Sequence, residues 1–391
     1  MFRKILFWSH LVCGVVAGVV ILTMSFTGVL LTYERQILAW MESRHFVPEA
    51  EQTERLSLEQ LAFIARTDHQ DIETTAIVVS NDPGAPVTFS AGRRAAVSLN
   101  PYSGQEMTTG SPGMEAFFST TTGLHRWFNL SGESRNTARA ITGASNLMFL
   151  FIILSGLYLW FPKIWRWSMF RMRLAFRSYG GNSRARDFNW HHVLGVWSAI
   201  PLAVIVATAS VFYYPWANNL VYQVYGETPP ARGRGPGPAA GGQSGETDMG
   251  SLPAAEPVYL NYDALFAHAR DFIESDGGQW RLISLNIPGH NSPDVSFAID
   301  QGNGGQPHLR HTLILSRTSG QVSDWQPFSS QSPGRQTRSI VRFLHTGEAL
   351  GITGQTIAGL VSFTSLIMVW TGLALAWRRL VSPRLRKKRT S

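Results

Sequence analysis

Four long apolar segments constrain this chain more than any other feature, because a backbone that crosses lipid must satisfy its hydrogen bonds internally. They lie at about residues 5–31, 141–161, 193–214 and 349–377. Each reaches or approaches the roughly 20 residues that a helix needs to span a hydrocarbon core of about 30 Å. The sequence therefore predicts a membrane protein with four transmembrane α-helices, separated by segments of ordinary soluble character.

Three clusters of basic residues adjoin these apolar segments, and all three fall on one side of the membrane. Lysines and arginines cluster at the N-terminus, in the short segment after the second helix and in the C-terminal tail, and the formal net charge is +8. Because Lys and Arg in short loops mark the cytoplasmic face, we expect a multi-pass protein of the bacterial inner (cytoplasmic) membrane with both termini cytoplasmic. The charge then serves topology and contact with membrane lipids, and we expect no nucleic acid partner.

The chain is also duplicated. HLVCGVVAG, starting at His10, recurs as HHVLGVWSA, starting at His191, and GLHRWF around His125 recurs as FLHTGE around His345. The long polar segments repeat too, each as a short amphipathic helix, strands with period-two alternation and a turn at Ser-Gly-Gln. We predict two periplasmic α+β domains, one in each half. The halves are expected to form a parallel two-fold repeat about an axis along the membrane normal.

These patterns give the expected domain boundaries. Transmembrane helices are expected at 1–33, 138–161, 191–217 and 345–377; the α+β domains at 34–137, with a juxtamembrane segment, and at 218–344; a basic cytoplasmic loop at 162–190; and a basic cytoplasmic tail at 378–391. The stretch 227–257 is rich in Gly, Pro and Ala and cannot build a core, so we predict that it is a flexible insert.

The duplicated histidines are the candidate site, because histidine in or beside a bilayer is expensive and marks functional positions. His10 and His191 open the first and third helices, at the cytoplasmic face, whereas His125 and His345 precede the second and fourth, at the outer face. If the halves pack symmetrically, each pair meets across the axis and offers one imidazole to each side of a haem iron. We therefore predict that these four side chains are axial ligands of two haems.

Plainer interpretations stay open for these residues. A membrane histidine can hydrogen-bond a neighbouring helix or relay protons. His192 adjoins His191 but points about 100° away around the helix, and the repeat favours His191 as the ligand. Arg126 and Arg139 are candidate partners of haem propionates, with interfacial snorkelling as the alternative.

Four elements in this order resemble the PepSY-associated transmembrane family: HLVCG at 10–14, LHRWF at 124–128, WHHVLG at 190–195 and LHTGEALG at 344–351. The chain is similar in particular to the family's inner-membrane ferric-siderophore reductases, of which the ferrioxamine reductases are one kind. The resemblance covers essentially the whole chain apart from the insert. It implies PepSY-like periplasmic domains, two haem b groups on the four histidines, and reduction of siderophore-bound iron in the periplasm.

We therefore expect a haem-dependent oxidoreductase that passes electrons across the membrane to a ferric siderophore. The chain carries no dinucleotide fingerprint, so the electron donor is expected to be a quinol or a separate cytoplasmic reductase. Two other classes stay open: a non-catalytic membrane regulator whose PepSY-like domains bind a peptidase, and a siderophore or metal transporter. A transporter favours broken helices and polar residues at mid-membrane, whereas a regulator needs no duplicated histidines.

Overall fold

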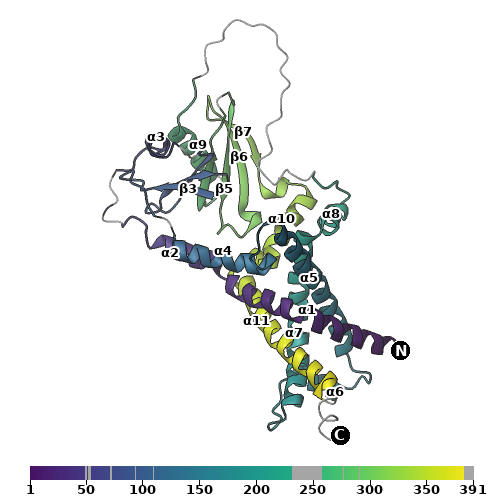
Figure 1. Cartoon of the computed structure of the whole chain (residues 1–391). Coiled ribbons are helices and arrows are strands. Elements are labelled where there is room, and N and C mark those ends of the chain that lie inside the picture. The colour runs from purple at the N-terminus through teal and green to yellow at the C-terminus, as the bar shows by residue number, and fades with distance from the viewer. Residues whose placement is uncertain are drawn as a thin grey trace. The chain divides into compact units, whose positions relative to one another are not determined.

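The computed structural model divides into two compact units (Figure 1). It describes residues 1–48, 51, 54–70, 73–92, 94–108, 110–230, 258–275, 277–289 and 291–382. Most of the predicted insert 227–257, and the basic tail from residue 383 onward, lie outside the described residues. Unit 1 comprises Met1–Gln36, Pro112–Glu227 and Thr337–Ser391, and unit 2 comprises Ile37–Ser111 and Thr228–Gln336.

Unit 1 is built on four long helices: α1 (Phe2–Leu31), α5 (Gly132–Trp160), α7 (Ser183–Tyr213) and α11 (Gly351–Leu380). These supply the four spans, within the described residues, that are long and apolar enough to cross a membrane. The prediction of a membrane protein with four such helices is thereby confirmed. α1 packs against α5 and α11, and α7 packs against the same two helices, so the four close into a bundle (Figure 1).

Two of these helices begin earlier than the hydropathy pattern predicts. α5 begins at Gly132 instead of 138, because the polar stretch GESRNTARA continues the helix out of the apolar segment. α7 begins at Ser183 instead of 191, where the Asn182 side chain caps it by accepting a hydrogen bond from the Ala185 N–H (3.1 Å). Pro201 lies inside α7 without ending it, and the helix stops at Tyr213.

Shorter helices precede or follow these four in the chain: α2 (Glu34–Ser43), α4 (Pro112–Trp127), α6 (Trp167–Leu174), α8 (Pro215–Gln223), α10 (Pro333–Thr346) and η4 (Glu348–Leu350). α4 joins α5 through a tight turn in which Phe128 and Asn129 both have positive φ (53° and 55°), a region that side chains other than glycine seldom adopt. Between α10 and α11 the same reversal uses Gly347 and Gly351 (φ 79° and 65°). Each of these two short helices therefore ends in a sharp turn just before an apolar helix.

Unit 2 contains one antiparallel sheet of seven strands in the order β3-β2-β1-β4-β5-β6-β7. The strands are β1 (Ala76–Ser80), β2 (Val87–Ala91), β3 (Arg94–Leu99), β4 (Leu282–Asn286), β5 (Asp294–Asp300), β6 (Arg310–Ser316) and β7 (Val322–Gln326), with short turns at η2 (Pro307–Leu309) and η3 (Phe328–Ser330). The sequence predicts two separate α+β domains, and here the structure differs. β1 pairs with β4 from Ala76↔Asn286 to Ser80↔Leu282, because this pairing covers one exposed strand edge of each copy.

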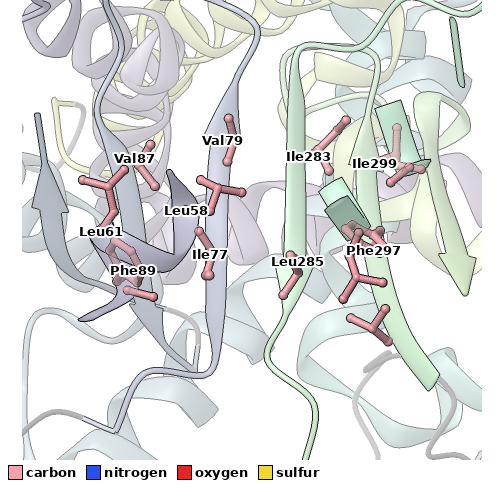
Figure 2. Close-up of a cluster of buried hydrophobic side chains, with 14 of the residues drawn as sticks. Leu58, Leu61, Ile77, Val79, Val87, Phe89, Ile283, Leu285, Phe297 and Ile299 are labelled. Carbon is pink, nitrogen blue, oxygen red and sulfur yellow. The ribbon is translucent and has the colours of Figure 1, made fainter. Parts of the chain in front are cut away.

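Two helices, α3 (Leu58–Asp68) and α9 (Tyr262–Ser275), pack against this sheet. Their buried side chains share one hydrophobic core with strands of both copies, including Ile77, Phe89, Leu285 and Phe297 (Figure 2). The two helices also cap each other at their N-termini.

Each of the helices α3 and α9 supplies a carboxylate that accepts hydrogen bonds from N–H groups at the start of the other. The Asp263 carboxylate accepts hydrogen bonds from the Leu58 and Glu59 N–H groups (2.8 and 3.3 Å), and the Glu59 carboxylate accepts one from the Tyr262 N–H (2.9 Å). A carboxylate at a helix N-terminus satisfies otherwise unpaired N–H groups and suits the helix dipole. The two copies are therefore joined at the helices as well as at the strands.

A single shared core predicts that a cavity in one copy is felt by the other. Leu285 on β4 is fully buried, and truncating it to alanine should cost about 2–5 kcal/mol. We expect Leu285→Ala to speed hydrogen exchange, read by mass spectrometry, in peptides from β1–β3 as well as β4–β7. Leu282→Ala, on the same strand but 37% exposed, is the matched control. Faster exchange confined to β4–β7 would show that the two copies open independently.

Candidate functional site

The four duplicated histidines lie in two pairs within unit 1. His125 on α4 and His345 on α10 have ring centroids 6.3 Å apart, with ring planes tilted by 57°. His10 on α1 and His191 on α7 lie within electrostatic range of one another. We call His10 and His191 the first pair, and His125 and His345 the second pair. The structure thus brings together the partners that the repeat predicts.

Each ring of the first pair is held through Nδ1 by the next helix of the bundle. The His10 Nδ1 lies 2.9 Å from the Ser155 Oγ on α5. The His191 Nδ1 lies 3.1 Å from both the Met368 carbonyl oxygen and the Thr371 Oγ1 on α11. Both rings are therefore anchored by a helix other than their own.

The second pair is held in the same way. The His125 Nδ1 lies 2.9 Å from the Thr27 Oγ1 on α1, and the His345 Nδ1 lies 2.8 Å from the Ile205 carbonyl oxygen on α7. Burial, and next the neighbouring His345, lower the pKa of His125 to about 4. Burial also lowers the pKa of His345, so both of these rings are neutral near pH 7.

The partners decide which ring nitrogen carries the hydrogen. A carbonyl oxygen only accepts, so the Nδ1 of His191 and of His345 must donate. The hydroxyls have one hydrogen each, and each has an acceptor on its own helix: Ser155 donates to the Phe151 carbonyl (2.6 Å), Thr27 to that of Thr23 (2.7 Å) and Thr371 to that of Ile367 (2.8 Å). These oxygens therefore accept from the histidines. All four rings therefore carry Nδ1–H, and in the neutral form of the ring this leaves the lone pair on Nε2.

The Nε2 atoms have no hydrogen-bond partner among the described residues. An imidazole with Nδ1–H bonded and Nε2 open is the state in which histidine binds a metal, and the Nδ1 contact fixes the ring orientation. Within the described part of the chain, no group of three or more His, Cys, Asp or Glu side chains suits a metal ion. The histidines therefore offer pairs of ligands, not a closed protein site.

Glycines make room for two of these rings. A Cβ added at Gly156 would lie 3.1 Å from the His10 Cε1, and one added at Gly372 would lie 3.2 Å from the His191 Cε1. A Cβ added at Gly28 would lie 3.7 Å from the His125 Cε1, an ordinary contact distance that a side chain tolerates.

Each of these glycines directly follows the hydroxyl residue that binds the ring, in the dipeptides Ser155-Gly156, Thr371-Gly372 and Thr27-Gly28. This is the signal that sequence reasoning missed. Gly14 and Gly195, which end the HLVCG and WHHVLG elements one turn beyond His10 and His191, do not have this role. A Cβ at Gly14 would meet nothing within 4 Å, and one at Gly195 would meet only the Met368 side chain.

The chain matches the family described as the PepSY-associated TM region over residues 7–379. It belongs to this family. The resemblance at family level is thereby confirmed. No curated protein matches the chain.

Two further histidines of this PepSY-associated protein differ from the four. His192 donates from Nδ1 to the Phe188 carbonyl of its own helix (2.9 Å) and packs on the Phe188 ring, so it holds no neighbouring helix. In unit 2, the His311 Nδ1 accepts the Phe328 N–H (3.3 Å) while its Nε2 bonds the Gln301 Oε1 (3.1 Å). His311 has both nitrogens satisfied and is a structural histidine.

The two predicted arginines lie beside the second pair. Arg126 follows His125 on α4, and burial, then the neighbouring arginines, lower its pKa. Arg139 on α5 donates from Nη2 to the Phe212 carbonyl (2.9 Å), and the Phe212 ring contacts His345 at 5.7 Å between centroids. Arg126 and Arg139 act on each other electrostatically, so the structure gathers both at the same end of the bundle as His125 and His345.

A large cavity of about 1270 Å³ lies in the described part of unit 2 of this PepSY-associated protein. Hydrogen-bonding side chains of β1 and β2 line it, including Ser80, Thr88 and Ser90, and Trp280 forms part of its wall. Neither His308 nor His311 is among its lining residues.

The hydrogen bonds predict the ring tautomers. In metal-free protein labelled with nitrogen-15 histidine, we expect Nδ1–H signals from the four paired histidines and an Nε2–H signal from His311. The reason is that each paired ring donates from Nδ1, whereas the His311 Nδ1 accepts. Loss of one signal in His311→Asn assigns the reference. Nε2–H tautomers at the paired histidines would contradict the arrangement.

Proposed function

We propose that this protein is a dihaem b-type oxidoreductase of the bacterial inner membrane that reduces siderophore-bound Fe(III) to Fe(II) in the periplasm. The observation that carries the proposal is the matched state of the four histidines: each binds a neighbouring helix through Nδ1 and keeps Nε2 for a metal. Two imidazoles on opposite sides of an iron are one of the ligand sets by which proteins hold haem and set its potential.

The spacing of the second pair supports a single metal between the two rings. Metal–imidazole bonds are about 2 Å long, which puts the centroids of two such rings about 6 Å apart. The observed separation between His125 and His345 is 6.3 Å. The observed separation therefore matches two imidazoles that share one metal ion.

An apolar groove lies between α1, α7 and α11, although neither His10 nor His191 is among its lining residues. The groove has a volume of about 590 Å³ and is lined by Leu22, Thr23, Phe26, Trp190, Leu366, Ile367 and Trp370. Trp190 precedes His191, and Trp370 precedes the Thr371 that binds it. Apolar walls with few polar groups suit a porphyrin face.

The chain's own residues would bind and orient the cofactor. The hydroxyls of Ser155, Thr27 and Thr371 would hold the ligand rings, and Arg126 and Arg139 would pair with propionates as charge-assisted donors. Haem would supply one-electron redox chemistry, which a chain without a redox side-chain pair lacks.

We infer that the two halves are parallel repeats with both termini cytoplasmic, which puts the first pair near the cytoplasmic face and the second near the periplasm. Ligands near both faces would divide a crossing of about 30 Å into shorter electron-transfer distances. The electron donor would be a quinol or a cytoplasmic reductase. A peptidase regulator or a transporter has no use for four matched ligand rings, so we favour the reductase over both.

Ligand substitutions test the cofactor. Replacing His10 or His191 by alanine should leave about one haem per protein, held by the second pair, and replacing His125 or His345 should leave the one held by the first pair. His192→Ala and His311→Ala are matched controls that should keep both haems, because neither ring donates from Nδ1 to a second helix. Pyridine haemochrome assays give the count. A colourless wild-type protein would contradict the proposal. Haem loss in His192→Ala would show that His192, and not His191, is the ligand in the first pair.

The activity test uses the same variants. Chemically reduced protein should be reoxidised by a ferric siderophore, with Fe(II) appearing in a ferrous trap. Loss of the first pair should stop electron flow across a vesicle membrane, yet spare chelate reduction when a small donor reaches the second pair directly. If the protein stays reduced in excess ferric chelate but is oxidised by oxygen, its physiological electron acceptor is some other molecule.

A further inference from the structure

Five arginines gather beside the second histidine pair. Arg126 on α4 interacts electrostatically with Arg135 and Arg139 on α5 and with Arg342 on α10, and Arg342 in turn acts on Arg338. They come from three helices that meet at one end of the bundle. The sequence pointed to only part of this cluster, which we call the arginine cluster.

Trp127 lies within reach of two of these guanidinium groups. The Cζ of Arg126 lies 4.7 Å from the Trp127 ring centroid, and the Cζ of Arg135 lies 4.1 Å from it. A guanidinium stacked on an aromatic face keeps its N–H groups available in its own plane. Trp127 therefore holds Arg126 and Arg135 side by side without neutralising either charge.

Phe212 connects the cluster to His345. Its ring contacts the His345 ring at 5.7 Å, and the Cζ of Arg338 lies 5.4 Å from its centroid. Its carbonyl accepts the hydrogen bond from Arg139. Phe212 therefore contacts both His345 and two members of the arginine cluster.

No carboxylate of the described residues compensates the charge of Arg126. Among the groups that act on Arg126 in the described chain, three are arginines and the favourable partner is the Tyr213 hydroxyl, with no carboxylate. The nearby Glu348 carboxylate is taken up by Arg35 (2.9 Å) and by the Thr346 hydroxyl (3.0 Å). Two propionates would neutralise two of these cations, and neither Arg135 nor Arg338 forms an ion pair with a carboxylate of the described residues, so positive charge remains. Such a surface attracts anions and repels cations.

We propose that the arginine cluster is a docking site for an anionic iron chelate, in which carboxylate or catecholate oxygens hold Fe(III) with net negative charge. This inference rests on the proposed function and narrows its substrate, because it disfavours cationic ferric hydroxamates. Arg135 is the residue assigned to the chelate, while Arg126 and Arg139 stay with the cofactor. In the reaction each iron accepts one electron from the reduced protein, Fe(III) becomes Fe(II), and no bond to the protein forms.

Binding is measured with redox-inert probes, so that it does not depend on turnover. Full-length, cofactor-loaded protein in phosphatidylcholine nanodiscs is titrated with gallium(III) citrate, an anion, and with the gallium(III) complex of desferrioxamine B, a cation. We expect binding of the anion alone, weakening as salt rises. Arg135→Gln should weaken it about 10-fold, the loss expected of one charge-assisted contact, and Arg135→Lys should keep part of it. Arg184→Gln, in the first turn of α7 far along the chain, is the matched control and should bind as wild type.

Three results would overturn the inference: equal binding of both probes, unchanged binding in Arg135→Gln with haem content retained, or loss of citrate binding when phosphatidylglycerol is included. The last result would assign the cluster to lipid phosphate.

Reoxidation of reduced protein by ferric citrate separates this inference from the proposed function. If gallium citrate binds through Arg135 but no iron is reduced, the docking site stands and the reductase proposal fails. If ferric chelates are reduced at rates independent of their charge and gallium citrate does not bind, the reductase stands and the docking site fails.

Discussion

The hydrogen bond from each histidine Nδ1 to a neighbouring helix is the contact on which the rest of the site depends. Serine and threonine in apolar helices commonly donate to a carbonyl one turn back, and Ser155, Thr27 and Thr371 all do so. With its only hydrogen committed, each oxygen acts toward histidine purely as an acceptor. Helix packing alone therefore fixes both the tautomer and the direction of the ring, and no further polar residue is needed in the membrane interior.

The two halves meet this constraint by different means at the second pair. Thr27 holds His125, and the sequence duplication aligns Thr27 with Thr208 and Gly28 with Ala209. Thr208, however, bonds only carbonyls of its own helix, and His345 takes the Ile205 carbonyl one turn earlier. A backbone acceptor cannot be removed by substitution, so the His345 side of the pair is the less mutable of the two.

The apolar helices and the pairing of the histidines could be predicted from the sequence, because hydropathy and an internal duplication report them directly. The anchoring dipeptides could not, since Ser-Gly and Thr-Gly are ordinary in membrane helices and gain meaning only beside a ring from another helix. Arg135 was missed for the same reason: its partner Trp127 lies across a turn whose positive φ angles at Phe128 and Asn129 follow no glycine pattern. The fusion of the two α+β copies depends on strand edges about 200 residues apart, as β1 and β4 are, and period-two alternation says nothing of which edge finds which.

That fusion has a mechanical consequence. β1 belongs to the first half of the chain and β4 to the second, and they are joined from Ala76↔Asn286 to Ser80↔Leu282, while Asp263 and Glu59 tie the helix ends across the same boundary. Moving one half of unit 2 relative to the other would break the hydrogen bonds between β1 and β4 and would remove both helix caps. The unit is therefore stiff across its own seam. Electron transfer leaves these contacts between the two copies in place. A mechanism that moves the two copies apart would have to break and re-form them at every turnover.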